Sequence, residues 1–283
     1  MSASHPTVAA LLVTHNAAGW IEQTLQGIRT QRHQPDAIVI VDDQSTDDTR
    51  AIIERVLGDQ AQILTSTSRV EDTTTRIAQN FLQGLRACTA YDIAVLGDHD
   101  DIWHPARIGH QANQLRLHPQ AAMLASNGRL VNSHGKPTGT TLRDAFPVPE
   151  DFNDLPAHER MRIAIRQSVA TGGASAVRPQ VFADEAIPAG WLHDRWWSLV
   201  ACARGAFRLD DDTVIDYRLT DTQEVGLDPG HQAQAPLARL QTAVTRAPQV
   251  LGKLRDLRSL ADQATDPEIR SALSTRSLLS ALA

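Results

Sequence analysis

Short apolar runs alternate with helical patterns along about the first 125 residues of the chain. Uninterrupted runs of four to eight apolar residues are typical of strands that are buried on both faces. Between the runs, apolar residues recur at every third or fourth position, as on the buried side of a helix. The runs lie at residues 8–13, 37–41, 92–97 and 121–126. The helical stripes are Ile21, Leu25 and Ile28; Ile52, Ile53 and Val56; and Ile77, Phe81, Leu82 and Leu85. This alternation predicts an α/β fold with a mainly parallel sheet and helices on both faces.

Polar residues stand where the first two helices would begin. Asn16 precedes the first stripe, and Ser45 or Thr46 precedes the second, so we expect these side chains to cap the helices. Asp100 or Asp101 can similarly cap a helix that begins near Pro105.

The second half of the chain is less regular. Residues 132–156 are rich in glycine, proline and polar residues, which predicts a long loop of the kind that often forms a lid. Residues 193–205 favour a helix and 207–219 favour a strand. From about residue 230, leucines recur at helical spacing. We therefore expect two parts, an α/β domain over residues 1–226 and a helical C-terminal extension over residues 227–283.

Composition excludes several classes of protein. The chain has 283 residues, 42% of them hydrophobic, and a net charge of -6, so a general nucleic-acid footprint is not expected. Two cysteines are too few for a disulfide framework. The first residues carry no basic segment before an apolar one, and no run approaches the roughly 20 apolar residues of a membrane span. We expect a cytoplasmic protein, with a place at the inner face of the membrane as an option.

Carboxylates follow two of the predicted strands directly. Asp42 and Asp43 follow residues 37–41, and Asp98, Asp100 and Asp101 follow residues 92–97. Ligands of open α/β sheets bind beyond the carboxyl ends of the strands. Oxygen ligands suit Mg²⁺ or Mn²⁺, which complete their shells with water and phosphate oxygens. The second cluster is thus a candidate platform for a metal-bound diphosphate, and the alternative is a solvated acidic loop or a helix cap.

Four segments together resemble one family. "VDDQSTDDT" (41–49) is similar to the V-D-D-G-S-x-D-x-T segment of family 2 glycosyltransferases, which have the GT-A fold. "GDHDDIW" (97–103), "HDRWWSLVA" (193–201) and "DYRLTDTQEVG" (216–226) resemble segments of its rhamnosyltransferase-like members. The resemblance implies a Rossmann-like GT-A domain over residues 1–226 and an inverting, metal-dependent transferase. Its donor would be a nucleotide-diphosphate sugar, with rhamnose the first expectation, and its acceptor a hydroxyl of a glycan or lipid-linked molecule, as in polysaccharide biosynthesis.

The resemblance also implies a role for individual residues. Asp194 would be the catalytic base, and the pair Trp196 and Trp197 offers a partly apolar setting that raises the pKa of a carboxylate. Nucleotide-sugar binding is implied for Thr14, Asn16, Asp42, Asp43 and Asp98. Binding of Mg²⁺ or Mn²⁺ is implied for Asp98, Asp100 and Asp101, with Asp101 either a ligand or a support. The acceptor side is implied at Gly172, Gly173 and Trp196.

Some positions depart from the family pattern. Gln44 stands where V-D-D-G-S has glycine, and Thr220 and Gln223 replace the histidine and asparagine expected after Tyr217-Arg218. These two replacements keep a second hypothesis open, a non-catalytic subunit that binds a nucleotide sugar. A sugar-nucleotide pyrophosphorylase is a third, but it needs a Gly- and Arg-rich loop with a lysine after the first strand, where the chain has "VTHNAAGW".

The C-terminal helices have three candidate partners. Residues 231–283 hold seven Arg or Lys and four Asp or Glu, so they are net basic. A basic, leucine-bearing helix can lie on an acidic bilayer, pair with a second subunit as a homodimer, or pack on the α/β domain. We expect packing, because leucine stripes are usually part of a core.

Overall fold

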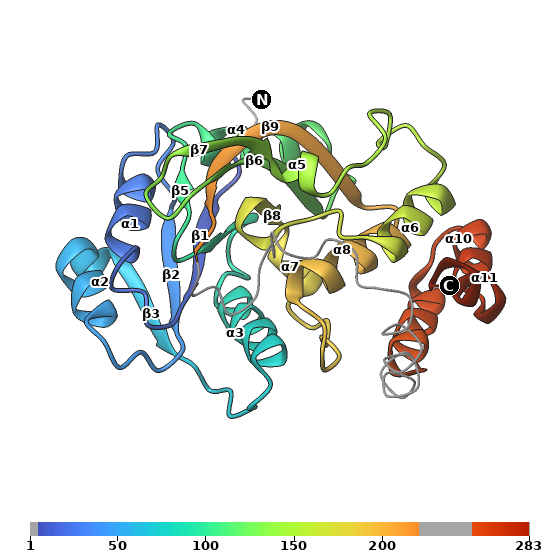
Figure 1. The fold of residues 1–283 in the computed structure, drawn as a ribbon, viewed down its shortest axis with the longest axis horizontal. Coiled ribbons are helices and arrows are strands. Elements are labelled where there is room, and N and C mark those ends of the chain that lie inside the picture. Colours follow the sequence, from blue (N-terminus) through green and yellow to red (C-terminus); the bar gives the residue numbers. More distant parts are fainter. Residues whose placement is uncertain (1–4, 221–250, 283) are drawn as a thin grey trace.

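A nine-stranded, largely parallel sheet forms the centre of the molecule (Figure 1). The computed structural model describes residues 5–220 and 251–282. The strands follow the order β3-β2-β1-β4-β8-β6-β9-β5, and β7 pairs with β6. Their bounds are β1 Val8–Thr14, β2 Ala37–Asp42, β3 Ala61–Thr65, β4 Ile93–Asp98, β5 Ile102–Trp103, β6 Met123–Val131, β7 Pro137–Thr141, β8 Ser175–Val177 and β9 Phe207–Arg218. The predicted α/β class, with a mainly parallel sheet between helices, is confirmed.

Helices cover both faces of this sheet. The α-helices are α1 Ile21–Arg29, α2 Thr49–Leu57, α3 Thr73–Ala87, α4 Arg107–Leu117, α5 Leu142–Ala145, α6 Ala157–Arg166, α7 Pro179–Phe182, α8 His193–Ala203, α10 Pro267–Ala272 and α11 Thr275–Leu282, and a further helical stretch spans residues 251–259. Three 3₁₀ turns are η1 Gly58–Gln60, η2 Gly172–Ala174 and η3 Leu260–Gln263.

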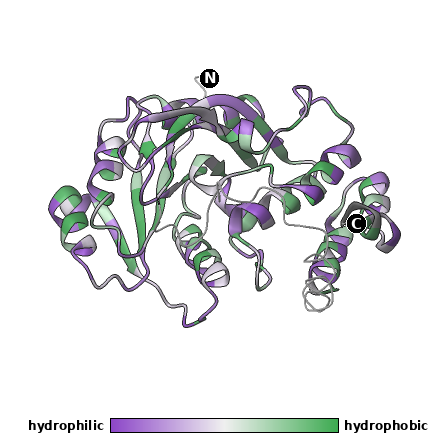
Figure 2. Cartoon of the chain, in the orientation of Figure 1, coloured by the Kyte–Doolittle hydropathy of each residue, from purple (hydrophilic) through white to green (hydrophobic). Residues whose placement is uncertain are grey.

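Strand β1 shows why its sequence is apolar at every position. Ala9 and Leu11 pack with α3, α6 and α8 on one face of the sheet. Ala10 and Leu12 pack with α1, α2 and α4 on the other. Successive side chains of a strand point to opposite faces, so a strand with helices on both sides needs an unbroken apolar run. Figure 2 shows the same pattern, with hydrophobic residues along β1 and β2 and hydrophilic residues on the outward sides of the helices.

The loops after β1 and β2 bond to each other instead of capping helices. The backbone N–H of Asn16 donates to Ser45 Oγ at 3.0 Å, and Asn16 Oδ1 accepts from the N–H of Thr46 at 2.8 Å. The N-cap residues of α1 and α2 are Trp20 and Asp48. The capping predictions were therefore wrong, because neighbouring parallel strands bring these two loops together and offer their polar groups lateral partners.

Residues 132–156 contain more regular structure than the sequence indicated. Strand β7 pairs antiparallel with β6, and Thr141 begins α5 with a capping box to Asp144. The prediction of one long loop was wrong in this part, since the threonine-rich strand β7 has little hydrophobic pattern and is held by its backbone pairing. Helix α4 likewise begins after Ala106, so neither Asp100 nor Asp101 caps it.

The described C-terminal residues pack against the sheet-bearing part of the chain. Their buried apolar residues, apart from Ala272, belong to the same core cluster as α6 and α8. Trp191 Nε1 donates to Asp256 Oδ2 at 3.0 Å across this contact. The buried apolar residues are Leu254, Leu257, Leu260, Ala264, Ile269, Ala272, Leu273 and Leu278. The packing prediction holds for them, while the boundary at residue 226 lies outside the described residues. No helix within the described ranges is long and apolar enough to cross a bilayer.

Both cysteines are free thiols inside the core. Cys88 lies at the end of α3 and Cys202 in α8, and both are buried. Desolvation raises the pKa of each thiol to about 12, so they stay protonated at neutral pH.

Gln44 occupies a backbone conformation that favours glycine. Its φ is 56°, and its side chain is exposed. A left-handed conformation costs a non-glycine residue about 1–2 kcal/mol. We predict that Gln44→Gly raises the free energy of unfolding by about 0.5–1 kcal/mol after the added chain entropy of glycine is subtracted. Urea denaturation measures the change. The matched control is Gln60→Gly, at an exposed position in η1, which is expected to lower stability; a Gln44→Gly protein that unfolds at lower urea would contradict the prediction.

Candidate functional site

A cavity of about 620 Å³ lies beyond the carboxyl ends of β1, β2 and β4. It is lined from both halves of the sheet and from α3 and α8, so residues more than 200 positions apart meet in it. The polar lining residues are Thr14, His15 and Asn16 after β1; Asp43 after β2; Asp98, His99 and Asp100 at the end of β4; Ser168 and Thr171 before η2; His193, Asp194 and Arg195 in α8; and Tyr217 and Thr220 in and after β9. This is the position at which open α/β sheets bind ligands.

Most of the predicted nucleotide-sugar residues line this cavity. Thr14, Asn16, Asp43 and Asp98 do so, whereas Asp42 does not. Asp42 is 3% exposed, and its Oδ1 accepts from Ser45 Oγ at 2.6 Å, so it supports the loop after β2. The difference follows from strand geometry, because adjacent residues at a strand end point in opposite directions.

Two further groups shape the part of the cavity beyond β1 and β2. Arg76, in the first turn of α3, donates from Nε to Asp43 Oδ2 at 2.8 Å. His15 Nδ1 donates to the carbonyl oxygen of Asp43 at 2.6 Å. The sequence analysis missed Arg76; its one signal was its place directly before Ile77, the start of the third apolar stripe. Thr14 Oγ1 is buried and has no hydrogen-bond partner among the described residues.

The acidic loop after β4 is held by its backbone carbonyls. Thr24 Oγ1 donates to the carbonyl oxygens of His99 and Asp101, at 2.9 and 2.8 Å. Arg218, at the end of β9, donates from Nε to the carbonyl oxygen of Asp100 at 2.9 Å and from its backbone N–H to Asp101 Oδ1 at 3.3 Å. The guanidinium also lies over the Trp20 ring, 4.6 Å from its centroid. These contacts fix the loop and leave carboxylates of the loop facing the cavity.

The three carboxylates of this loop have different environments. Asp98 and Asp100 line the cavity. Asp101 does not; it is fully buried, and its Oδ2 has no partner within the described part of the chain. Gly173 lies against this pair, because a Cβ at its position would be 2.3 Å from Asp101 Oδ2 and 2.8 Å from Asp98 Oδ2. Asp98 and Asp100 are thus placed to meet a ligand, and Asp101 lies beneath them.

Burial leaves this cluster short of positive charge. Desolvation, followed by the carboxylates of Asp100 and Asp194, raises the pKa of Asp98 to about 7. Desolvation, followed by the carboxylates of Asp100 and Asp98, holds the pKa of Asp101 well above its ordinary value. The guanidinium carbon of Arg107 lies 3.8 Å from the centroid of the Trp103 ring. Burial of this guanidinium lowers its pKa to about 9. A cation that enters the cavity therefore gains from several carboxylates at once.

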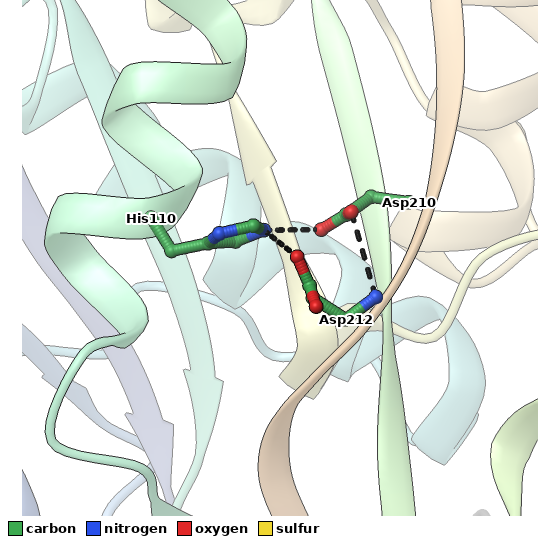
Figure 3. A group of neighbouring side chains, drawn as sticks. All are labelled: His110, Asp210 and Asp212. Carbon is green, nitrogen blue, oxygen red and sulfur yellow. Dashed lines mark hydrogen bonds and ion pairs between the residues drawn. The ribbon is translucent and has the colours of Figure 1, made fainter.

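A separate His–Asp–Asp cluster lies away from the cavity (Figure 3). His110 Nε2 on α4 donates to Asp210 Oδ2 at 2.7 Å and approaches Asp212 Oδ2 at 3.3 Å, both on β9. Ser126 Oγ donates to the same Asp210 oxygen at 2.9 Å. The candidate ligand atoms of this cluster lie within 4.8 Å of one another, close enough to share an ion. Among the described residues, the acidic loop does not form such a three-ligand group. The sequence analysis did not single out this cluster.

Asp194 faces the cavity from the first turn of α8. Its Oδ2 accepts from the N–H of Gly172 at 2.8 Å, and its Oδ1 accepts from the N–H of Arg195 at 2.6 Å. Arg195 in turn donates to the carbonyl oxygens of Ala164, Ile165 and Gln167 and joins α8 to the end of α6. The carboxylate is therefore held at the N-terminus of α8 by two backbone N–H groups.

The predicted acceptor-side residues separate in the structure. Gly172 lines the cavity, and Gly173 instead lies against the acidic loop. Trp196 is 2% exposed, does not line the cavity, and packs with its ring centroid 5.4 Å from that of Trp191. Two residues along a helix rotate the side chain by about 200°, so Trp196 points into the core when Asp194 points into the cavity.

Solved structures of several glycosyltransferases share this fold. Staphylococcus aureus TarS (residues 1–349, in complex with UDP-GlcNAc) superposes with a TM-score of 0.61 at 14% identity, over 96% of this chain and 71% of that one. The mannosyltransferase PcManGT from Pyrobaculum calidifontis, in complex with GDP-Man and Mn²⁺, gives 0.56 at 16% identity, over 98% and 70%. Glucosyl-3-phosphoglycerate synthase from Mycobacterium tuberculosis, with Mn²⁺, UDP and glucosyl-3-phosphoglycerate, gives 0.53 at 17% identity, over 93% and 82%.

These identities are low enough that the likeness establishes the fold alone. No curated protein sequence matches the chain. The sequence model of glycosyl transferase family 2 does, over residues 10–181, which is more than half of the chain and includes most of β1, the acidic loop and η2. The protein therefore belongs to glycosyl transferase family 2 and is a glycosyltransferase.

Proposed function

We propose that this protein transfers a sugar from a nucleotide-diphosphate donor to a hydroxyl of a glycan or lipid-linked acceptor, with inversion and with a divalent cation. The observation that carries the proposal is that Asp98, Asp100 and Asp194 line one cavity from β4 and α8. A metal-binding pair and a base-like carboxylate thus share a space large enough for a nucleotide sugar. Rhamnose is the first candidate for the sugar, by resemblance of the segments around Asp100 and Asp194.

The donor set of the acidic loop fits a divalent cation. Asp98 and Asp100 offer carboxylate oxygens, which suit Mg²⁺ or Mn²⁺, and Asp101 adds a buried negative charge beneath them. Two carboxylates are sufficient, since these ions usually keep water and phosphate oxygens in the remaining positions. When bound, the ion would neutralise charge that develops on the leaving diphosphate. The cluster of His110, Asp210 and Asp212 lies outside the cavity, so we assign it no part in the transfer.

We assign to Asp194 the role of the base that receives the proton of the acceptor hydroxyl. The N–H groups of Gly172 and Arg195 orient its two oxygens, and further lone pairs remain for the acceptor. One base and one displacement at the anomeric carbon invert its configuration. Thr14, Asn16 and Asp43 line the end of the cavity beyond β1 and β2, where we place the nucleotide.

The first test is a thermal-shift screen of UDP, GDP and dTDP, each with and without Mn²⁺. We expect one nucleotide to stabilise the protein only with metal, by about 2.7 kcal/mol at a hundred times its Kd. Asp100→Ala should abolish this shift. Asp194→Asn should keep the shift and lower release of the nucleoside diphosphate from the matching sugar donor about 10²–10⁴-fold.

The matched control for this screen is His110→Ala, which removes the imidazole of the cluster outside the cavity and should leave the metal-dependent shift intact. A protein that no nucleotide stabilises would contradict the donor assignment. An Asp194→Asn enzyme with full activity would contradict the role of the base, and nucleotide binding without any turnover in the wild type would favour the non-catalytic subunit instead.

Metal binding should strengthen as the pH rises through about 7. The pKa of Asp98 is raised to about 7 in the metal-free protein, so this carboxyl is mostly protonated at pH 6 and mostly ionised at pH 8. A cation must displace the proton, and we therefore expect the Mn²⁺ concentration that gives half the nucleotide-dependent shift to fall about tenfold from pH 6 to pH 8. The same pH dependence of Mn²⁺ binding should be found in the His110→Ala variant. Equal Mn²⁺ affinity at both pH values would exclude Asp98 as a ligand that titrates in this range.

A side chain at residue 173 should disturb the metal pair. In Gly173→Ala the new Cβ would meet buried oxygens of Asp101 and Asp98, which have little room to move. We expect the free energy of unfolding to fall by about 1–3 kcal/mol and the Mn²⁺-dependent shift to weaken. Gly19→Ala is the matched control, because no atom lies within 4 Å of the position of its Cβ. If both variants behave alike, the close approach of Gly173 to the acids is not functional.

A further inference from the structure

A buried histidine lies beside Asp194 at the cavity wall. His193 is 3% exposed and lines the cavity. Neither ring nitrogen has a hydrogen-bond partner among the described residues. Buried polar groups are nearly always paired in proteins, because an unpaired one loses its bonds to water without compensation. We therefore expect a ligand in the cavity to supply a hydrogen-bond partner for a ring nitrogen of His193.

The ring is fixed in position by packing. It stacks on Phe81 of α3 with a centroid distance of 3.6 Å and an interplanar angle of 17°. Trp197 meets it edge-on at 5.4 Å. Gly172 closes a third side, since a Cβ there would lie 2.5 Å from Nε2. A ring held this way cannot turn toward a distant protein partner, and because the residue borders the cavity, a ligand there is the candidate partner.

The imidazole is neutral at physiological pH. Desolvation lowers its pKa to about 4, and the charge of Asp194 opposes this only in part. A neutral imidazole has one N–H donor and one acceptor nitrogen. Sugar hydroxyl groups both donate and accept hydrogen bonds, so they match this pair of functions.

We propose that His193 hydrogen-bonds a sugar hydroxyl in the cavity and so positions a substrate next to Asp194. The inference rests on the proposed function and extends it with a residue that selects for a hydroxyl. The hydroxyl comes from the transferred sugar or from the acceptor, and the experiment separates these sources. A purely structural histidine, packed only for its shape, is the competing explanation.

The test replaces His193 by phenylalanine, which keeps a flat ring on Phe81 and removes both nitrogens. The probe is the nucleotide sugar from which the wild type releases nucleoside diphosphate in the presence of Mn²⁺, chosen from a panel of UDP-, GDP- and dTDP-sugars. We expect kcat/KM to fall about 10- to 100-fold while the melting temperature stays level or rises, because unpaired polar atoms leave the core. His193→Gln and His193→Asn each restore one nitrogen position, and partial rescue by either identifies the nitrogen used.

Binding measurements locate the hydroxyl. If it belongs to the transferred sugar, His193→Phe weakens binding of the sugar donor and leaves binding of the free nucleoside diphosphate unchanged. If it belongs to the acceptor, both affinities are unchanged and only transfer to a sugar acceptor falls. An active His193→Phe enzyme with unaltered kcat/KM for hydrolysis and transfer overturns the inference. A wild type that binds nucleotide but processes no donor overturns the proposed function itself.

Discussion

The hydrogen bonding of Arg218 to the acidic loop is the interaction on which the site depends. Its guanidinium and backbone N–H reach Asp100 and Asp101 from the end of β9, 118 and 117 positions away in the chain. Its Nη2 also donates to Gln23 Oε1 of α1 at 2.6 Å. One buried arginine thereby joins the two halves of the sheet at the place where carboxylates must stay close to each other. A lysine has one compact charge and cannot make the same set of directed bonds.

The fold holds these carboxylates together against their mutual repulsion. Arg107 lies in the core near Asp98 and Asp101, yet burial raises the pKa of both acids, so its compensation is incomplete. The phenol of Tyr217 among them has its pKa raised well above the usual value by burial and by the same acids. A cluster of buried carboxylates with incomplete compensation of its charge is suited to binding a cation.

The short segment around η2 links the two chemical groups of the cavity. Gly172 donates to Asp194 and lies against His193, while Gly173 lies against Asp98 and Asp101. Two adjacent glycines thus set the distance between the acidic loop and α8, because any side chain at either position would push one of them away. The assignment of this stretch to the acceptor side stays a prediction, and it did not include the contact of Gly173 with the acidic loop.

The alternation of apolar runs and helical stripes was enough to predict the sheet, since burial on both faces leaves a direct record in the sequence. The acidic residues at and after the ends of β2 and β4 were likewise visible, because strand ends have local signals. Asp194 was indicated only by the resemblance of its H-D-x-W segment to the family. The sequence did not show which of these side chains face the cavity. Asp42, Asp101 and Trp196 are buried and do not line it. Nor could the sequence reveal Arg76 on Asp43 or the unpaired ring of His193. Local periodicity determines which elements form, whereas side-chain direction and pairing depend on neighbours brought close only by the packing of distant segments.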